Sequence, residues 1–179
     1  MTDAPATGAC RMNSTRLFRL TLLLALTCAS ARAHDPSDIT AQARLLPGGI
    51  ELRLTLAWST ASRLFVEGRP ARAIRPERFD EIRPALQLRA PGFLLVTAGG
   101  KTLAPESVVA ELSRDGDVKI LLQFPPVAAP RFRFDAALLK TLPDGYTVFL
   151  LWRGPRDDQF VHQRLTLEEQ SCEIAAFPH

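Results

Sequence analysis

The chain has 179 residues, of which 46% are hydrophobic and 23% charged, and its formal net charge is +3 at pH 7. Four of the 22 lysines and arginines and one of the 19 acidic residues lie before residue 34, so the remainder carries 18 of each. The positive charge therefore belongs to the leading segment. This balance gives no electrostatic case for a nucleic-acid-binding protein.

The leading segment, residues 1–33, has the three parts of a secretory signal peptide. Arg16 and Arg19 form a basic region, residues 20–28 an apolar region, and Ala31-Arg32-Ala33 a small-residue cleavage site. The apolar region is far shorter than the ~20 residues of a membrane-spanning helix. We therefore expect cleavage after Ala33 and a periplasmic or secreted protein with no membrane span after that point.

Two methionines, Met1 and Met12, can start this leader, because the sequence after Met12 already contains a complete basic region. Cleavage after residue 33 leaves 146 of the 179 residues, an ordinary size for one domain. We expect that domain over residues 34–170 and a flexible tail over residues 171–179. The tail contains Cys172, the one cysteine of three that survives cleavage, so no internal disulfide can form.

Short strands separated by turn residues account for most of the domain. Residues 50–56 alternate apolar and polar side chains, and Pro47-Gly48-Gly49 joins them to residues 39–46 in a hairpin. The other predicted strands are residues 93–97, 107–113, 118–124, 131–134, 146–152 and 160–167, with turns at Gly99-Gly100, Asp115-Gly116 and Gly154-Pro155. About eight such strands predict a mainly β protein, an Ig-like or Greek-key sandwich of two sheets.

One segment, residues 59–91, departs from this pattern and predicts a helical insertion. Pro76 precedes the acidic residues expected in a first helical turn, and Phe79, Ile82 and Leu86 share one helical face. Pro84 lies within the same segment. Because proline lacks an N–H group and clashes with the preceding turn, we expect Pro84 to kink or split this helix.

Histidine is the candidate metal ligand. Cleavage makes His34 the first residue, so its α-amine and imidazole can chelate one metal ion, an arrangement that suits copper. His162 on a late strand is the candidate second ligand, with Asp35 and Asp38 as oxygen donors. The alternative is that His34 follows the cleavage site by chance and that His162 is an ordinary surface residue.

Catalytic motifs are not found in this sequence. It contains no nucleophile elbow, phosphate-binding glycine loop, paired-cysteine motif or zinc-protease motif. The paired acids Asp157-Asp158 and Glu168-Glu169 are adjacent on the chain, so on a strand they point to opposite faces. We expect a protein that is not an enzyme.

Several short motifs resemble the soluble domain at the front of bacterial HupE/UreJ-like membrane proteins. They are Ala33-His34-Asp35-Pro36, Gly100-Lys101-Thr102-Leu103-Ala104-Pro105 and Leu142-Pro143-Asp144-Gly145-Tyr146. In those proteins the domain precedes a multi-helix unit associated with nickel or cobalt, and this sequence lacks that unit. The resemblance implies an exported, non-catalytic binding or accessory protein that acts beside a membrane protein.

A second resemblance covers about 25 residues near the end of the chain. Residues 142–148, Trp152-Arg153 and the following His162 resemble the last hairpin of CopC-type copper-binding sandwiches, which also begin with histidine after export. The Asp-Gly-His segment of that family is replaced here by residues 157–162. This resemblance implies the alternative function, a periplasmic copper carrier that uses His34 and His162.

Overall fold

The computed structural model describes residues 37–65, 75–156 and 158–177. They belong to one compact unit that extends over Asp35–His179. The predicted signal peptide, His34 and Asp35 lie outside the described residues.

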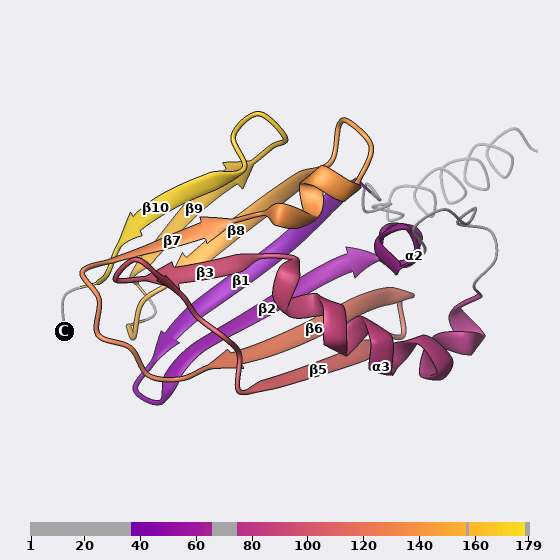
Figure 1. Ribbon diagram of the computed structural model, residues 1–179, viewed down its shortest axis with the longest axis horizontal. Coiled ribbons are helices and arrows are strands. Elements are labelled where there is room, and N and C mark those ends of the chain that lie inside the picture. The colour runs from indigo at the N-terminus through magenta and orange to yellow at the C-terminus, as the bar shows by residue number, and fades with distance from the viewer. Residues whose placement is uncertain (1–36, 66–74, 157, 178–179) are drawn as a thin grey trace, which may run out of the picture. The chain divides into compact units, whose positions relative to one another are not determined.

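Two sheets form the framework of this unit (Figure 1). The six-stranded sheet has the order β5-β6-β2-β1-β8-β9, and the four-stranded sheet has the order β10-β7-β3-β4. The strands are β1 (Asp38–Leu46), β2 (Gly49–Ala57), β3 (Leu95–Ala98), β4 (Lys101–Thr102), β5 (Ser107–Leu112), β6 (Asp117–Phe124), β7 (Arg131–Asp135), β8 (Thr147–Arg153), β9 (Phe160–Leu165) and β10 (Ser171–Ala175). The expected two-sheet sandwich is confirmed. Strands β1 and β8 pair in parallel, whereas the other pairs are antiparallel.

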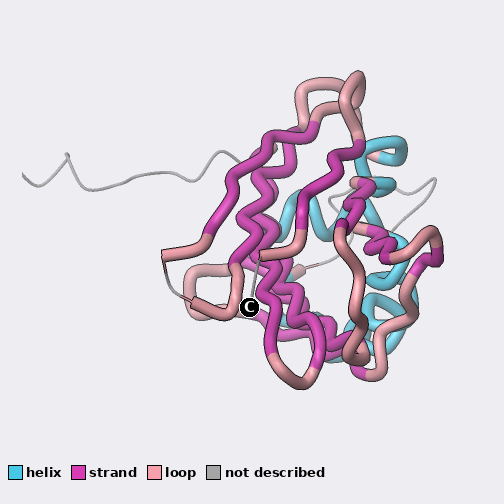
Figure 2. The backbone as a smooth tube through the Cα atoms, turned by 90° about the vertical axis from the view of Figure 1, so that its left-hand side faces the viewer, coloured by secondary structure: helices cyan, strands magenta, loops and turns pink. Residues whose placement is uncertain are grey.

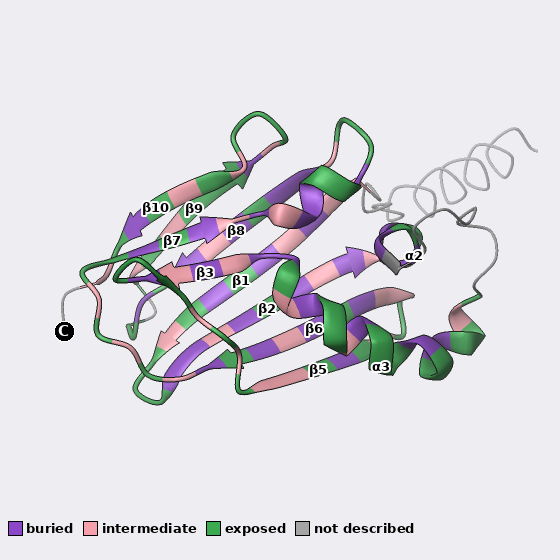
Figure 3. Cartoon of the chain, in the orientation of Figure 1, coloured by how far each residue is buried: buried purple, intermediate pink, exposed green. Residues whose placement is uncertain are grey.

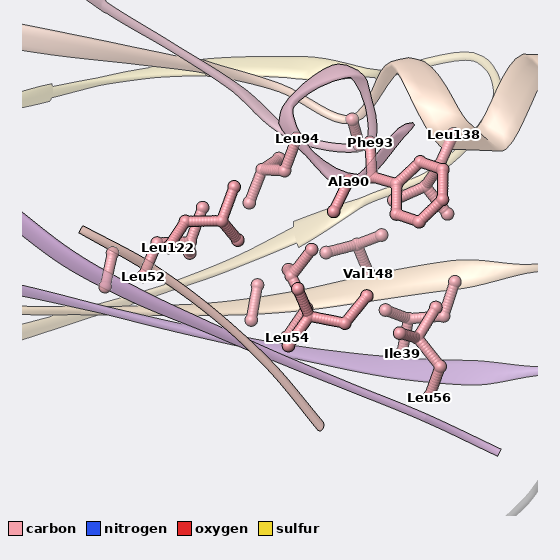
Figure 4. Close-up of a cluster of buried hydrophobic side chains, with 14 of the residues drawn as sticks. Ile39, Leu52, Leu54, Leu56, Ala90, Phe93, Leu94, Leu122, Leu138 and Val148 are labelled. Atoms are coloured by element: carbon pink, nitrogen blue, oxygen red, sulfur yellow. The ribbon is translucent and has the colours of Figure 1, made fainter. Parts of the chain in front are cut away.

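Alternation along the strands places the core between the sheets (Figure 3). On β2 the side chains of Leu52, Leu54 and Leu56 are fully buried, while Glu51 and Arg53 point outward and form an ion pair. Burial of each such leucine stabilises the fold by roughly 1.5–3 kcal/mol. Figure 4 shows these leucines facing apolar side chains from β1, β6, β8 and the short helices.

Helices make up the part of the predicted insertion that the structure describes, and residues 66–74 lie outside the described residues. The helices are α2 (Trp58–Phe65), η3 (Pro76–Arg78), α3 (Phe79–Arg89) and η4 (Ala90–Gly92), and a further turn, η5 (Ala137–Thr141), precedes β8. As predicted, Phe79, Ile82 and Leu86 are the buried residues of α3.

Helix α3 runs through Pro84 without a break, so the expected split is wrong. Pro84 and Asp80 both lie on the exposed face of the helix. Because Pro84 has no N–H group, it cannot donate the usual helical hydrogen bond to the Asp80 carbonyl. Water can satisfy that carbonyl, and the three buried side chains hold the helix against the sheet.

The second layer of the sandwich combines the four-stranded sheet with α3. Both lie on the same face of the six-stranded sheet, as the two views together show (Figures 1 and 2). The Gln87 side chain of α3 donates a hydrogen bond of 3.1 Å to the Val108 carbonyl of β5. No element of the described chain covers the opposite face of the six-stranded sheet. Within the described ranges, no helix has both the length and the apolar character of a membrane span.

The predicted tail over residues 171–179 needs correction. Residues 171–175 form β10, which pairs with β7 from Ser171↔Asp135 to Ala175↔Arg131. Ile174 points into the core and is 6% exposed. The other side of β7 is occupied by β3, so this short segment completes the pairing of β7 and extends the sheet by one strand.

Candidate functional site

The candidate site is a depression at the end of the sandwich where the β1–β2 hairpin, the β6–β7 connection and the end of β10 meet (left in Figure 1). We call it the end pocket. Its volume is about 740 Å³. Its lining residues are all apolar: Leu45, Leu46, Pro47, Gly49, Pro126, Val127, Ala128, Ala129, Pro130, Phe132, Pro155, Ala176 and Phe177.

The β1–β2 hairpin forms one wall of the end pocket. Leu46 pairs with Gly49, and Gly49 has a φ of +133°. A side chain at Gly49 would place its Cβ 2.0 Å from the carbonyl oxygen of Phe124. Only glycine fits this position, because it combines a backbone conformation that disfavours side chains with close contact to β6.

A proline-rich connection, residues 125–130, forms the opposite wall. Pro125, Pro126 and Pro130 fix the φ angle at about −65° and carry no N–H groups that would need acceptors. The N–H of Ala176 donates a hydrogen bond of 2.9 Å to the Pro130 carbonyl, so the segment after β10 is fixed to this connection. The walls are therefore stiff and offer few polar groups.

Aromatic side chains support the pocket from below. The ring of Phe132 lies 5.1 Å from that of Trp152, and Phe177 stacks on Trp152 at 6.3 Å with an interplanar angle of 14°. Gly154 allows this approach, since a Cβ there would lie 2.6 Å from the Phe177 ring. Filling or emptying the pocket should therefore change the surroundings of Trp152.

Trp152 also carries a polar group without a partner. Its indole N–H is buried, and no acceptor among the described residues lies within hydrogen-bonding distance. Leaving such a donor unsatisfied costs about 1–3 kcal/mol. The packing of the Trp152 ring against Phe132, Phe134 and Phe177 must outweigh this penalty.

The chemistry of the end pocket follows from its lining. None of the lining residues can ionise, act as a nucleophile or donate a side-chain hydrogen bond. Transfer of apolar surface from water is the interaction that such walls favour. The pocket can hold an apolar group, and it has no residue that could transfer a proton to it.

The predicted metal ligands are not brought together in the described residues. His162 lies on β9, exposed on the outer face of the six-stranded sheet, with its ring 5.4 Å from that of Phe160. In the strand register His162 lies in the same row as Gln42 of β1. Asp38 lies four residues before Gln42, so it is ~13 Å away from this row along the strand. The described chain contains no cluster of three or more histidine, cysteine, aspartate or glutamate residues that could hold a metal. Because His34 lies outside those ranges, the copper site stays a prediction.

The paired acidic residues of the sequence analysis are separate from the end pocket. Asp158, Glu168 and Glu169 are exposed, as expected for solvated turn residues, and Asp157 lies outside the described residues. Hydrogen bonds with its own backbone N–H and with Thr166 lower the pKa of Glu168. These carboxylates do not lie among the residues of any described cavity.

Cys172 lies on β10 opposite Phe134 and is half-buried. Burial raises the pKa of its thiol from 9.0 to about 11, and a hydrogen bond with the Phe134 backbone opposes this only in part. The thiol is therefore protonated near neutral pH. A protonated thiol is a poor nucleophile and a poor metal ligand.

Family models and curated proteins were compared with the chain. No family model matches the chain, and no curated protein matches it significantly. The resemblances to HupE/UreJ-like domains and CopC-type sandwiches therefore stay predictions.

The end pocket was not predicted from the sequence, although one signal for it was present. Three prolines within residues 125–130 exclude a regular strand or helix there, so an irregular wall of apolar residues could be expected. That this wall meets the β1–β2 hairpin and Phe177 depends on the pairing of β7 with β10, which the sequence did not reveal.

Proposed function

We propose that this protein is an exported, non-catalytic binding protein that holds an apolar group of a partner or ligand in the end pocket, beside a membrane protein. The observation that carries the proposal is the lining of this pocket, whose side chains are all apolar. Export is supported by the signal-peptide pattern of residues 1–33.

The size of the end pocket supports binding of a ligand larger than a single methyl or ring. Its volume of about 740 Å³ lies in the range of 300–1,000 Å³ typical of small-molecule sites. Most ligand sites add a few polar groups that fix orientation, and here only backbone groups can do so. We therefore expect affinity for apolar groups with little selectivity among them.

Trp152 provides the readout for a direct test. The chain has two tryptophans, Trp58 and Trp152, so Trp58→Phe leaves Trp152 as the single donor for energy transfer. We would titrate the chain from His34 onward with N-phenyl-1-naphthylamine, an uncharged probe that fluoresces in apolar surroundings. The proposal predicts saturable binding to one site with energy transfer from Trp152.

Two substitutions make the test specific. Ala128 lines the end pocket and is exposed, so Ala128→Phe should fill the pocket without disturbing the core. Ala85 is exposed on α3, and Ala85→Phe adds the same apolar group elsewhere. We expect Ala128→Phe to weaken probe binding about tenfold and Ala85→Phe to leave it unchanged. Equal binding by both variants, or no saturable binding at all, contradicts the proposal.

A further inference from the structure

The uncovered face of the six-stranded sheet carries a second surface, made of outward-pointing residues on three neighbouring strands. The strand register places them in three rows: Thr40, Phe149 and Arg164; Gln42, Leu151 and His162; Arg44, Arg153 and Phe160. We call these nine residues the outer array. None of the nine residues lines the end pocket.

Two large apolar side chains are exposed in the outer array. Phe149 is 42% exposed and Phe160 is 55% exposed. A shallow depression of about 400 Å³ lies beside Phe149 and is also lined by His162 and Arg164. Exposed aromatic rings that lie near one another on an uncovered face mark a candidate contact surface.

The charges of the outer array have one sign. It contains three arginines and no carboxylate, whereas the part of the chain after residue 33 is formally neutral. Asp38 lies one row beyond the array, and Glu51, the neighbour of Arg44 on β2, is ion-paired with Arg53. Neither Arg153 nor Arg164 forms an ion pair with another described residue.

The outer face of the four-stranded sheet provides a contrast. There Arg131 lies 3.6 Å from Glu173, and Arg133 donates a hydrogen bond of 3.0 Å to Ser171. Arginines on that face therefore have partners within the chain. Arg153 and Arg164 of the outer array have no ion-pair partner among the described residues, so they can meet negative charge from outside.

The size and charge of the outer array indicate what it meets. Three strands and three rows span ~10 Å by ~13 Å. The area of this rectangle is far smaller than the ~800 Å² that each partner buries in a stable protein interface. A second copy of the chain would bring arginines against arginines. An anionic lipid surface needs no matching shape, and each arginine and each aromatic ring adds to the binding independently.

We propose that the outer array docks the protein on an anionic phospholipid membrane. Arg153 and Arg164 then meet the phosphates of the lipid headgroups, and Phe149 and Phe160 enter the interfacial layer. This inference does not depend on the end pocket, and it places the protein where a membrane partner would be met.

Co-sedimentation with vesicles tests the proposal. The chain from His34 onward would be mixed with phosphatidylcholine vesicles that contain about one quarter phosphatidylglycerol, and with pure phosphatidylcholine vesicles. We expect binding to the anionic vesicles alone, weakened by salt. Each arginine should contribute roughly fivefold, so Arg153→Gln with Arg164→Gln should lower the partition coefficient roughly 25-fold. Phe149→Ser with Phe160→Ser should lower it as well.

The matched control is Arg131→Gln with Arg133→Gln, which removes the same charge from the opposite sheet. We expect this variant to bind within about twofold of the unmodified chain. All the substituted residues are exposed or on outer faces, and circular dichroism would show that each variant is folded. Absence of binding to anionic vesicles, or equal losses in the two arginine variants, overturns the proposal. Binding to poly-glutamate without binding to vesicles also overturns it. Probe binding in the end pocket is measured separately, so the two proposals can fail independently.

Discussion

The end pocket and the outer array are built in opposite ways. Separate stretches of the chain, mostly turns and proline-rich connections, converge to form the end pocket, and its lining has no charged side chain. The outer array comes from alternate residues of three neighbouring strands, and three of its nine residues are arginines. The end pocket therefore depends on how distant chain segments meet, whereas the outer array depends on the register of its strands. Substitutions should therefore separate them clearly.

The largest effect is expected beneath the end pocket. Trp152→Ala should lower the free energy of unfolding by about 3–5 kcal/mol, because Trp152 is fully buried among aromatic rings. Trp152→Phe keeps a ring and removes the N–H that has no acceptor, so its effect should stay below about 1.5 kcal/mol. Urea denaturation measures both. A loss for Trp152→Phe as large as that for Trp152→Ala would contradict an indole N–H without an acceptor.

The next largest effect on stability is expected at the β1–β2 hairpin, which forms one wall of the end pocket. Gly49→Ala should lower the free energy of unfolding by about 1–3 kcal/mol and weaken probe binding, because its Cβ would meet the Phe124 carbonyl at 2.0 Å. Gly48 is adjacent and has no atom within 4 Å of a built Cβ. Gly48→Ala should change stability by less than about 0.5 kcal/mol. A similar loss in both variants would contradict the close approach of the hairpin to β6.

A smaller change in folding stability is expected at high pH. The folded chain holds the Cys172 proton more tightly than the unfolded chain, because burial raises its pKa from 9.0 to about 11. Stability should therefore not depend on this thiol below pH 9 and should fall as the pH rises from there through 11. Cys172→Ser should remove that part of the decline. Rapid labelling of the folded protein by iodoacetamide at pH 8 would contradict the burial of the thiol.

The smallest effect is expected at His162. Its side chain is exposed, so His162→Ala should change stability by less than about 0.5 kcal/mol and leave probe binding unchanged. The same variant tests the copper alternative. Cu(II) would be titrated into the chain that begins at His34 and into a chain with one extra leading residue. We expect the two titrations to agree, whereas tight binding lost on blocking the amine and on His162→Ala would favour the copper carrier.

Local sequence patterns were enough for most of the sandwich. Alternation in residues 50–56 and glycines at the turns, such as Gly116 with its φ of +85°, predicted β2 and the β5–β6 hairpin. These signals depend on side chains within a few residues. For that reason they identified strands and hairpins but not the order of the strands in the sheets.

Surfaces formed by residues far apart in the sequence could not be predicted from those patterns. β10 contains only two inward apolar positions, Cys172 and Ile174, so its alternation is too short to distinguish a strand from a tail. Phe160 has the composition of a core residue, yet it is exposed because Leu165 sets the register of β9 against β8. The end pocket needs both β10 and the proline-rich connection in place before it exists.

NMR chemical-shift mapping would show directly whether apolar groups bind in the end pocket. Spectra of the labelled chain from His34 onward would be recorded with and without N-phenyl-1-naphthylamine. We expect the shifts to concentrate on Val127, Ala128, Ala129 and Phe177, with His162 and Arg164 unchanged. Shifts centred on the outer array, or spread evenly over the sandwich, would contradict it.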